Sequence, residues 1–238
     1  MRRRDLRWIL SAFLFIFCGA NFSFAQQPAK APQSAPPAGL NDTWKGTDID
    51  PLVGRLEAES REIYKERARL AALVAPKPGS AIADIGAGSG FMVEEFAKLV
   101  GPKGKVYAVD INPKMMERVA QRARELNMPQ IQTIVTREDS VDLAPASVDM
   151  VFVCDTYHHF EYPQKSLEGI RRALRSGGEL IVVDFERIPG KSPEFVFTHV
   201  RAGKEDFIKE ITAAGFALRQ DHAAPFFKDN YVLRFVKK

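Results

Sequence analysis

The residues whose types and spacing best suit ligand binding form a glycine-rich run at positions 84–90, Asp-Ile-Gly-Ala-Gly-Ser-Gly. The run follows a short apolar stretch and precedes a helical pattern. Its glycines therefore allow a tight turn that brings the backbone close to a ligand, while the next helix offers free N–H groups. Asp110 stands at the end of the next apolar stretch, where a carboxylate can accept both hydroxyls of a ribose. Together the two features predict a nucleoside-binding site.

The spacing of the glycines indicates which class of nucleoside binds. A dinucleotide fingerprint requires G-x-G-x-x-G. Here the glycines are Gly86, Gly88 and Gly90, and the sixth position of the pattern is Phe91. This spacing argues against a dehydrogenase, which the fold class alone would leave open.

A second group of reactive side chains follows the predicted strand at 148–154. Because histidine has an ordinary pKa of about 6.5, His158 and His159 are candidate general bases for an acceptor hydroxyl or amine. We expect Asp155 to hold a positively charged group or a substrate donor, and Tyr157 to line the pocket. The alternatives are that one histidine packs or caps while the other faces the cleft, and that Asp155 and Tyr157 belong to a strand-end turn.

Asp155, His158, His159 and Glu161 are close enough in sequence to be considered as metal ligands. Adjacent histidines on one loop rarely converge on an ion, and neither the H-x-x-E-H nor the H-E-x-x-H spacing is present. We therefore expect no metal site.

A further pair of candidates, His199 and Arg201, lies after the fifth predicted strand in a segment rich in proline and glycine. We expect this segment to be a loop, and loops at such positions usually determine substrate choice. The pair is predicted to close over the acceptor, the alternative being an exposed loop pair.

Short apolar strands alternate with helical stretches from residue 80 onward, which predicts an α/β domain with a parallel sheet covered by helices on both faces. Such sheets bind ligands beyond the carboxyl ends of their strands, where the strand order reverses. Upstream, a charged but periodic segment predicts one amphipathic helix at 52–75. The expected strands are 80–85, 105–110, 131–136, 148–154, 179–184, 216–220 and 231–236, and the expected helices are 91–100, 113–127, 164–175 and 204–214.

Residues 1–25 predict a signal peptide, with a basic start, an apolar run and small residues at a cleavage site after Ala25. The apolar run is shorter than the roughly 20 residues needed to cross a bilayer, which favours a cleaved signal peptide. A permanent membrane anchor is the alternative. Either reading places the domain outside the cytoplasm, and we expect a periplasmic protein. Residues 26–40 predict a Pro/Ala-rich linker, 41–76 an N-terminal helical lid, and 77–238 the main domain.

Charge and cysteine content exclude some partners. The formal net charge is +4, but without the predicted signal peptide it falls to +1, and no dense run of lysine or arginine remains. Nucleic acid is therefore not an expected partner. Of the two cysteines, Cys18 lies in the signal peptide, and we expect Cys154 to pack as a small hydrophobic residue.

From about residue 77 to residue 216 the chain resembles the class I S-adenosylmethionine-dependent methyltransferases, in particular the type 11 and ubiquinone/menaquinone-biosynthesis-like group. The run at 84–90 matches the D-x-G-x-G-x-G motif of that family, and Asp110 matches its ribose-binding acid. Residues 137–143 resemble the stretch after the third strand, 148–152 the fourth strand, and 172–178 the turn before the fifth strand.

This resemblance implies a Rossmann-like fold with a mostly parallel seven-stranded sheet, and S-adenosylmethionine as cofactor. It places Asp139 at the adenine amino group, Ser140 beside the ring and Asp155 on the sulfonium side. The cofactor contacts that it implies are Asp84, Gly86, Ala87, Gly88, Gly90, Asp110, Ile111, Asp139, Ser140 and Asp155.

The expected function is methyl transfer from S-adenosylmethionine to an unidentified small-molecule or lipid-like acceptor. Transfer from a sulfonium needs mainly alignment and exclusion of water, so no catalytic residue is obligatory. Because the cofactor is made in the cytoplasm, an exported non-catalytic nucleoside-binding module is the alternative. An aminopropyl transferase is a third hypothesis, for which only Asp155 and Glu161 offer acidic side chains in the acceptor cleft.

Overall fold

The computed structural model describes residues 39–238. The predicted signal peptide and most of the predicted linker lie outside the described residues. Within the described part, none of the helices combines the length and the apolar character that crossing a bilayer demands.

A seven-stranded sheet in the order β3-β2-β1-β4-β5-β7-β6 forms the centre of the domain. The pairings among β1 to β5 are parallel, and β7 runs antiparallel to both β5 and β6. The sheet is therefore mostly parallel, as predicted, and the strand order reverses between β1 and β4. The strands are β1 Ala81–Ile85, β2 Lys105–Asp110, β3 Ile131–Val135, β4 Val148–Cys154, β5 Leu174–Phe185, β6 Phe216–His222 and β7 Asn230–Lys237.

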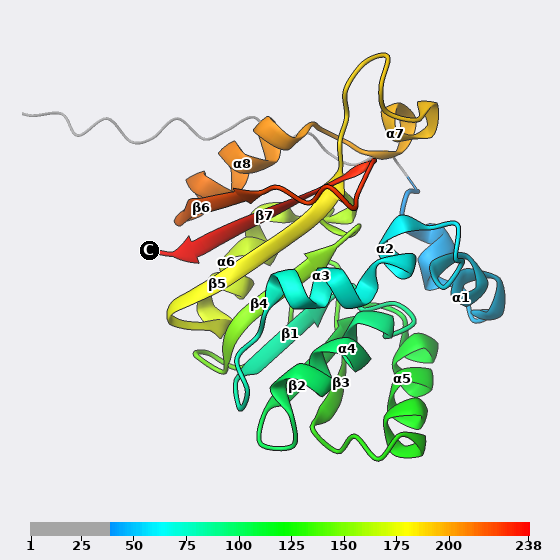
Figure 1. Cartoon of the computed structure of the whole chain (residues 1–238), viewed down its shortest axis with the longest axis vertical. Helices are drawn as coiled ribbons and strands as arrows, with labels where there is room; N and C mark the ends of the chain where they lie inside the picture. The colour runs from blue at the N-terminus through cyan, green and yellow to red at the C-terminus, as the bar shows by residue number, and fades with distance from the viewer. Residues whose placement is uncertain (1–38) are drawn as a thin grey trace, which may run out of the picture.

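Helices cover both faces of the sheet (Figure 1) because the central strands are apolar on both sides. Along β4, Val151 and Val153 pack with the cluster that includes Leu167 of α6. Phe152 points to the other face, where it meets Phe96 of α4 edge to face, with ring centroids 4.9 Å apart. The helices after β1 are α4 Phe91–Val100, α5 Pro113–Glu125, α6 Pro163–Ala173, α7 Glu194–His199 and α8 Lys204–Ala213, with the 3-10 helix η2 at Tyr157–His159.

The N-terminal segment contradicts the prediction of one helix at 52–75. It folds into a 3-10 helix and three short helices, η1 Asp42–Lys45, α1 Asp50–Leu56, α2 Glu62–Lys65 and α3 Arg67–Val74. The helix breaks after Leu56, and the guanidinium of Arg61 turns back to donate to the Leu56 carbonyl at 3.1 Å and to the Asp155 carboxylate at 2.7 Å. Contacts with the main domain therefore override the helical propensity of this segment.

Hydrogen bonds fix the start of this segment over the end of β2. The Nδ2 group of Asn112, the residue that caps α5, donates to the carbonyls of Trp44 at 2.7 Å and Gly46 at 3.0 Å. The Oδ1 atom of the same side chain accepts the N–H of Lys114 at 2.9 Å. One buried side chain thus starts α5 and anchors η1 beside the carboxyl edge of the sheet.

The segment between β5 and α8 was expected to be a loop, but it contains α7. This helix follows Pro193, whose backbone is suited to the start of a helix, and Val196 is fully buried. The apolar anchor makes the segment a packed cover rather than an open loop.

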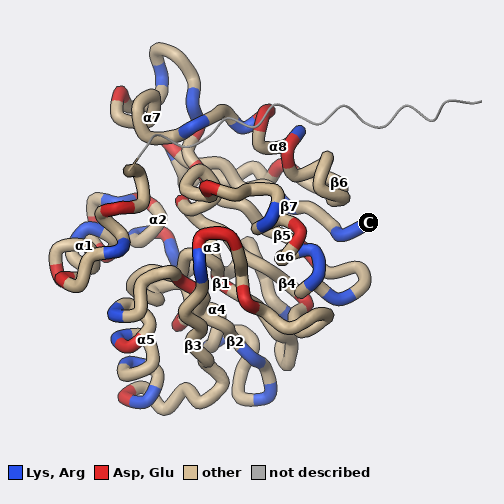
Figure 2. The backbone as a smooth tube through the Cα atoms, turned by 180° about the vertical axis from the view of Figure 1, so that it is seen from behind, with Lys and Arg blue, Asp and Glu red and all other residues tan. Residues whose placement is uncertain are grey.

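Charged residues of both signs alternate on the surface helices. Figure 2 shows lysine and arginine mixed with aspartate and glutamate along α5 and α8. Pairs such as Lys114–Glu117 on α5 and Lys209–Asp206 on α8 lie at helical spacing. Charges of opposite sign therefore lie side by side on these two helices.

Candidate active site

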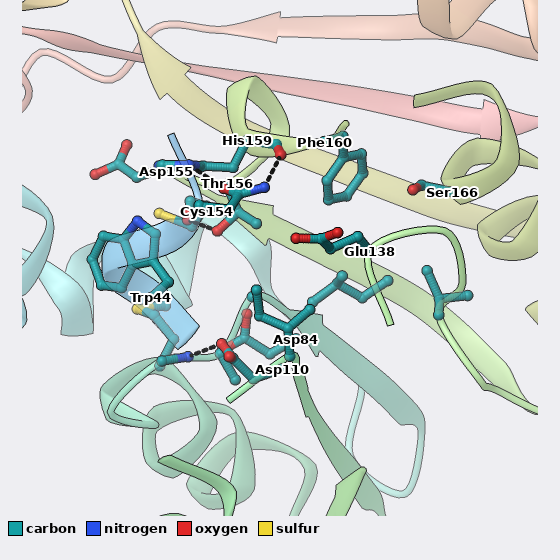
Figure 3. A pocket seen from close by; sticks show the side chains of 18 of the residues that line it. Trp44, Asp84, Asp110, Glu138, Cys154, Asp155, Thr156, His159, Phe160 and Ser166 are labelled. Atoms are coloured by element: carbon teal, nitrogen blue, oxygen red, sulfur yellow. Dashed lines mark hydrogen bonds between the residues drawn. The ribbon is translucent and has the colours of Figure 1, made fainter. Parts of the chain in front are cut away.

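A cavity opens at the carboxyl ends of β1, β2 and β4, where the strand order reverses (Figure 3). Its walls come from the glycine-rich turn, the end of β2, the loop after β3, the residues after β4 and the N-terminal segment. This is the location predicted for a ligand in a doubly wound sheet.

The glycine-rich turn forms part of the cavity wall and packs closely against its neighbours, because two of its residues lack side chains. Gly86 and Gly88 both line the cavity, with φ values of +76° and +52°. A Cβ atom on Gly86 would lie 2.3 Å from Thr156, and one on Gly88 would lie 2.9 Å from Leu56. Any larger residue would therefore fill the cavity wall or displace its neighbours.

Gly90, the third glycine, has a different role. It lies outside the cavity lining, at the start of α4. A Cβ atom there would lie 2.7 Å from Val119 of α5. The missing side chain of Gly90 thus permits close packing of α4 and α5, and its contact with the cofactor stays a prediction.

Asp110 presents a partly satisfied carboxylate to the cavity. Its Oδ2 atom accepts the N–H of Gly88 at 2.9 Å, and its Oδ1 atom accepts the N–H of Asn112 at 2.9 Å. A carboxylate has about four acceptor sites, so Asp110 retains acceptor capacity for a ribose hydroxyl beyond its backbone donors. Ile111, the next residue, also lines the cavity, as predicted.

Asp84 is a buried acid at the base of the same cavity. Its side chain is 3 % exposed. Burial, and secondarily the nearby charge of Asp110, raises the pKa of Asp84 to about 8. The carboxyl group is therefore mostly protonated at neutral pH, and a cationic ligand would favour its ionised form.

The loop after β3 faces the cavity with different residues from those predicted. Ser140 lines the cavity, as predicted, and so does Glu138, whose carboxylate is 2.5 Å from the Lys45 ammonium. Asp139 lies outside the lining. Its carboxylate is 40 % exposed and pairs with Lys165 at 3.3 Å and Arg137 at 3.4 Å. Asp139 lines an adjoining hollow that shares Ile111, Arg137 and Glu138 with the cavity, so its adenine contact stays a prediction.

Asp155 lies at the end of β4 in a left-handed backbone conformation, with φ +45°, and it lines the cavity. Its carboxylate accepts from Arg61 at 2.7 Å and from Nδ2 of Asn230 at 2.6 Å. Burial raises the pKa of Asp155, and the charge of Arg61 opposes this rise. Asp155 therefore faces a possible ligand as half of a buried ion pair with Arg61.

The two candidate bases, His158 and His159, are in different surroundings. His159 lines the cavity, whereas His158 is 1 % exposed and lies behind it. Burial, together with the neighbouring His158 and His199, lowers the pKa of His159 to about 2. An imidazole with so low a pKa accepts protons weakly, which argues against His159 as a general base and favours a neutral hydrogen-bonding or ligating group.

Tyr157 does not line the cavity, which corrects the prediction. Its ring is fully buried against Phe160 and Phe207, with centroids 5.3 and 4.9 Å away. Its hydroxyl donates to Glu210 at 3.1 Å. After β4, the consecutive residues Cys154, Asp155 and Thr156 line the cavity, whereas Tyr157 turns into the core.

His199 and Arg201, which were predicted to act as a pair, lie in different surroundings. The ring of His199, at the end of α7, lies 4.9 Å from that of His158 and 5.0 Å from that of His159. The guanidinium of Arg201 is buried in the core and makes two 2.7 Å contacts with Glu210. Only His199 therefore approaches the cavity residues.

Several cavity residues escaped sequence reasoning because distant segments supply them. Arg61 stood in a stretch predicted to be one helix, so its return to Asp155 had no signal. Thr156 and Phe160 flank the recognised histidines and could have been found from that position alone. The other missed lining residues include Asn41, Trp44, Leu56, Phe91, Met92 and Cys154, the last of which was expected to pack as a hydrophobic residue.

Residues 83–182 match the family model described as a methyltransferase domain. Among curated proteins, the chain is 28 % identical over 113 residues to a ubiquinone/menaquinone biosynthesis C-methyltransferase of Hydrogenovibrio crunogenus, covering 47 % of this chain and 44 % of the relative. It is 32 % identical over 108 residues to the enzyme of that name from Blochmanniella floridana, covering 45 % and 42 %. The chain thus spans less than half the length of these relatives.

Solved structures share the fold over a larger part of the chain. A SAM-dependent methyltransferase from Aquifex aeolicus superposes with a TM-score of 0.70 at 22 % identity, covering 79 % of this chain and 98 % of that one. The [4+2]-cyclase SpnF gives a TM-score of 0.70 at 13 % identity, covering 87 % and 98 %. The predicted fold is confirmed, and it also occurs in a protein named as a cyclase.

Proposed function

We propose that this chain transfers a methyl group from S-adenosylmethionine to a small-molecule or lipid-like acceptor. Its class I S-adenosylmethionine-dependent methyltransferase domain is the basis of this proposal. The observation that supports this most is the turn at Gly86 and Gly88, which meets the Asp110 carboxylate at one end of the cavity. The cofactor, when bound, supplies the electrophilic methyl group.

The residues present fit that cofactor. The turn brings its backbone to the cavity wall, because Gly86 and Gly88 carry no side chains and pack directly against Thr156 and Leu56. Asp110 retains acceptor capacity for ribose hydroxyls beyond its backbone donors. Asp84 also lines the cavity, and a cationic group of the cofactor would favour the ionised form of its carboxyl group.

The contribution of the chain to the reaction is alignment and exclusion of water. Trp44, Leu56, Phe91 and Phe160 give the cavity an apolar wall, and Arg61 bridges this wall to Asp155. An apolar wall suits an aromatic or lipid-like acceptor. The names of the relatives make quinone-type ring carbons the first acceptor class to test.

The compartment is part of this proposal. The basic and apolar start of the sequence supports export to the periplasm, with a membrane-anchored domain outside the cytoplasm as the alternative. An exported module that binds the cofactor without turnover is the competing function. It predicts binding of S-adenosylmethionine but no methylated product.

The test is transfer of a labelled methyl group from S-adenosylmethionine to a panel of quinone precursors and lipid extracts by the full chain. We expect label in the organic product and in no product of the Asp110→Ala variant. If the wild-type chain binds the cofactor and labels no acceptor of the panel, the non-catalytic module is favoured.

A further inference from the structure

Three of the four histidines in the sequence converge beside the cavity, although they come from two separate segments of the chain. His158 and His159 lie in η2 after β4, and His199 is the last residue of α7. The rings of His158 and His159 are 4.3 Å apart between centroids. One ligand atom from each of the three side chains lies within 4.8 Å of the other two.

We propose that His158, His159 and His199 form a binding site for one divalent transition-metal ion of the zinc type. Imidazole nitrogen suits zinc, copper, iron and nickel, whereas magnesium and calcium prefer oxygen ligands. The set of three histidines contains no carboxylate in the ligand positions. Mg²⁺ is therefore not the expected ion.

His158 provides the strongest support because one of its nitrogens is buried without a partner. Its Nδ1 atom lies 2.7 Å from Oδ1 of Asp184, a fully buried carboxylate. A carboxylate oxygen accepts, so the Nδ1–H of His158 donates to Asp184 and Nε2 is the nitrogen that remains for a ligand. This Nε2 has no hydrogen-bond partner among the described residues. A buried acceptor in that state is explained by a missing ligand.

His159 is arranged in the same way by Asn41. The Nδ1 atom of His159 lies 2.9 Å from Oδ1 of Asn41. The Nδ2 group of Asn41 donates to Glu161 at 2.9 Å and to the His159 carbonyl at 3.0 Å. These two acceptors fix the orientation of the amide, so its oxygen receives the Nδ1 hydrogen and leaves Nε2 of His159 free. Partners of this kind commonly orient metal-binding histidines.

His199 completes the set from a different part of the chain. Two nitrogens bound to one ion at about 2.1 Å stand roughly 3 to 3.5 Å apart. The present spread of up to 4.8 Å therefore needs a shift of about 1 Å. His199 ends a helix of six residues and is only partly buried, so it is the ligand most able to move.

The acidic residues considered from the sequence do not belong to this site. Asp155 is held by Arg61 and Asn230, and Glu161 accepts from Asn41. The sequence predicts no metal site because only these acids lie near the two adjacent histidines along the chain. The third ligand comes from α7, which sequence spacing could not place beside η2.

The position of the ion gives it a use in the proposed reaction. His159 lines the cavity, so the open coordination positions would face the acceptor end. An acceptor oxygen or sulfur bound there loses its proton more easily, because a metal ion lowers the pKa of its ligand. This last step rests on the proposed methyltransferase function, whereas the metal site itself does not.

The test is titration of Zn²⁺, and separately of Mg²⁺, into the metal-free full chain by calorimetry. Replacement of Zn²⁺ by Co²⁺ would provide visible absorption bands. His199→Ala is the main variant because its side chain is partly exposed and leaves the core intact. His222→Gln is the matched control, since this fourth histidine lies in β6 and contacts Arg234 at 3.1 Å.

We expect one Zn²⁺ per chain, weak binding of Mg²⁺, and at least a 100-fold loss of Zn²⁺ affinity in His199→Ala with none in His222→Gln. Asp184→Asn, a change at a positioning residue, should weaken binding by about 10- to 100-fold. The proposal is overturned if the folded wild-type chain binds no stoichiometric Zn²⁺, or if His199→Ala binds it as tightly as His222→Gln. Binding of S-adenosylmethionine by the same samples separates this outcome from failure of the proposed function.

Discussion

The two ends of the cavity are built in opposite ways. At one end, Gly86, Gly88 and Asp110 come from consecutive strand ends, and Asp110 contacts the turn directly at 2.9 Å. At the other end, His159 meets Asn41 and His199, which belong to two other segments of the chain. A local motif thus defines the nucleoside end, whereas long-range packing assembles the acceptor end. The first can be recognised in a sequence and the second cannot.

The largest expected effect is at the nucleoside end. Asp110→Ala removes both acceptors for the ribose hydroxyls and also the partner of the Gly88 N–H. Because hydrogen bonds to a charged group contribute about 1.5–3 kcal/mol each, S-adenosylmethionine affinity should fall at least about 100-fold. Calorimetric titration measures this loss.

Asp139→Ala is the matched control for that prediction, since Asp139 lies in the neighbouring loop, is not among the residues that line the cavity, and pairs with Lys165 and Arg137. The affinity of Asp139→Ala for S-adenosylmethionine should stay within about threefold of the wild-type value. Equal losses in the two variants would contradict the assignment of the ribose site.

Tyr157→Phe tests whether Tyr157 belongs to the core and not to the cavity. The change removes the hydrogen bond to Glu210, which keeps its two contacts with Arg201. We expect the free energy of unfolding to fall by about 1 kcal/mol with cofactor affinity unchanged. Urea denaturation measures the first quantity, and a large loss of affinity at unchanged stability would place Tyr157 in the site after all.

Asp84 predicts a pH dependence of stability. Its folded pKa, about 8, lies above the ordinary value of 3.8, so the folded chain binds a proton more strongly than the unfolded chain. The contribution of Asp84 to the free energy of unfolding is fully present below pH 3.8 and is lost as the pH rises through 8. Asp84→Asn should therefore lose less stability than the wild type between pH 4 and pH 8, as measured by urea unfolding across that range.

The same group predicts proton release on binding. At pH 7 a carboxyl group with a pKa of about 8 is mostly protonated, and a cationic cofactor favours its ionised form. Titrations in two buffers of different ionisation enthalpy should show close to one proton released per S-adenosylmethionine bound by the wild type, and none by Asp84→Asn. Equal release by both proteins would assign the proton to another group.

The smallest effect is expected in the loop after β3. Glu138 faces the cavity but is paired with the partly exposed Lys45, and such pairs contribute about 0–1 kcal/mol. Glu138→Gln should lower cofactor affinity by less than about fivefold, whereas Asp139→Asn should leave it unchanged. A larger effect of Asp139→Asn would restore the contact expected from the sequence.

Much of the fold was predictable from the sequence. Residues 91–100, 105–110 and 148–154 form the predicted elements with the predicted bounds, because buried strands and amphipathic helices have strong local patterns. The helix predicted at 52–75 is interrupted after Leu56, in the stretch where Arg61 reaches Asp155. Local periodicity contains no information on such a contact.

The candidate site shows the same division. Gly86, Gly88, Asp110 and Ser140 line the cavity as predicted. Asp139 and Tyr157 do not, because a side chain one residue away in a loop or turn can point to the opposite side, and only the tertiary contacts of Lys165 and Glu210 decide which. The sequence thus located the segments of the site but not the direction of each side chain.

The central claim is that the cavity at the carboxyl ends of β1, β2 and β4 binds S-adenosylmethionine, and calorimetric titration of the full chain tests it most directly. The structure predicts one S-adenosylmethionine per chain, displaced by S-adenosylhomocysteine and lost in Asp110→Ala. A wild-type chain that is folded by circular dichroism and binds neither compound would contradict the claim.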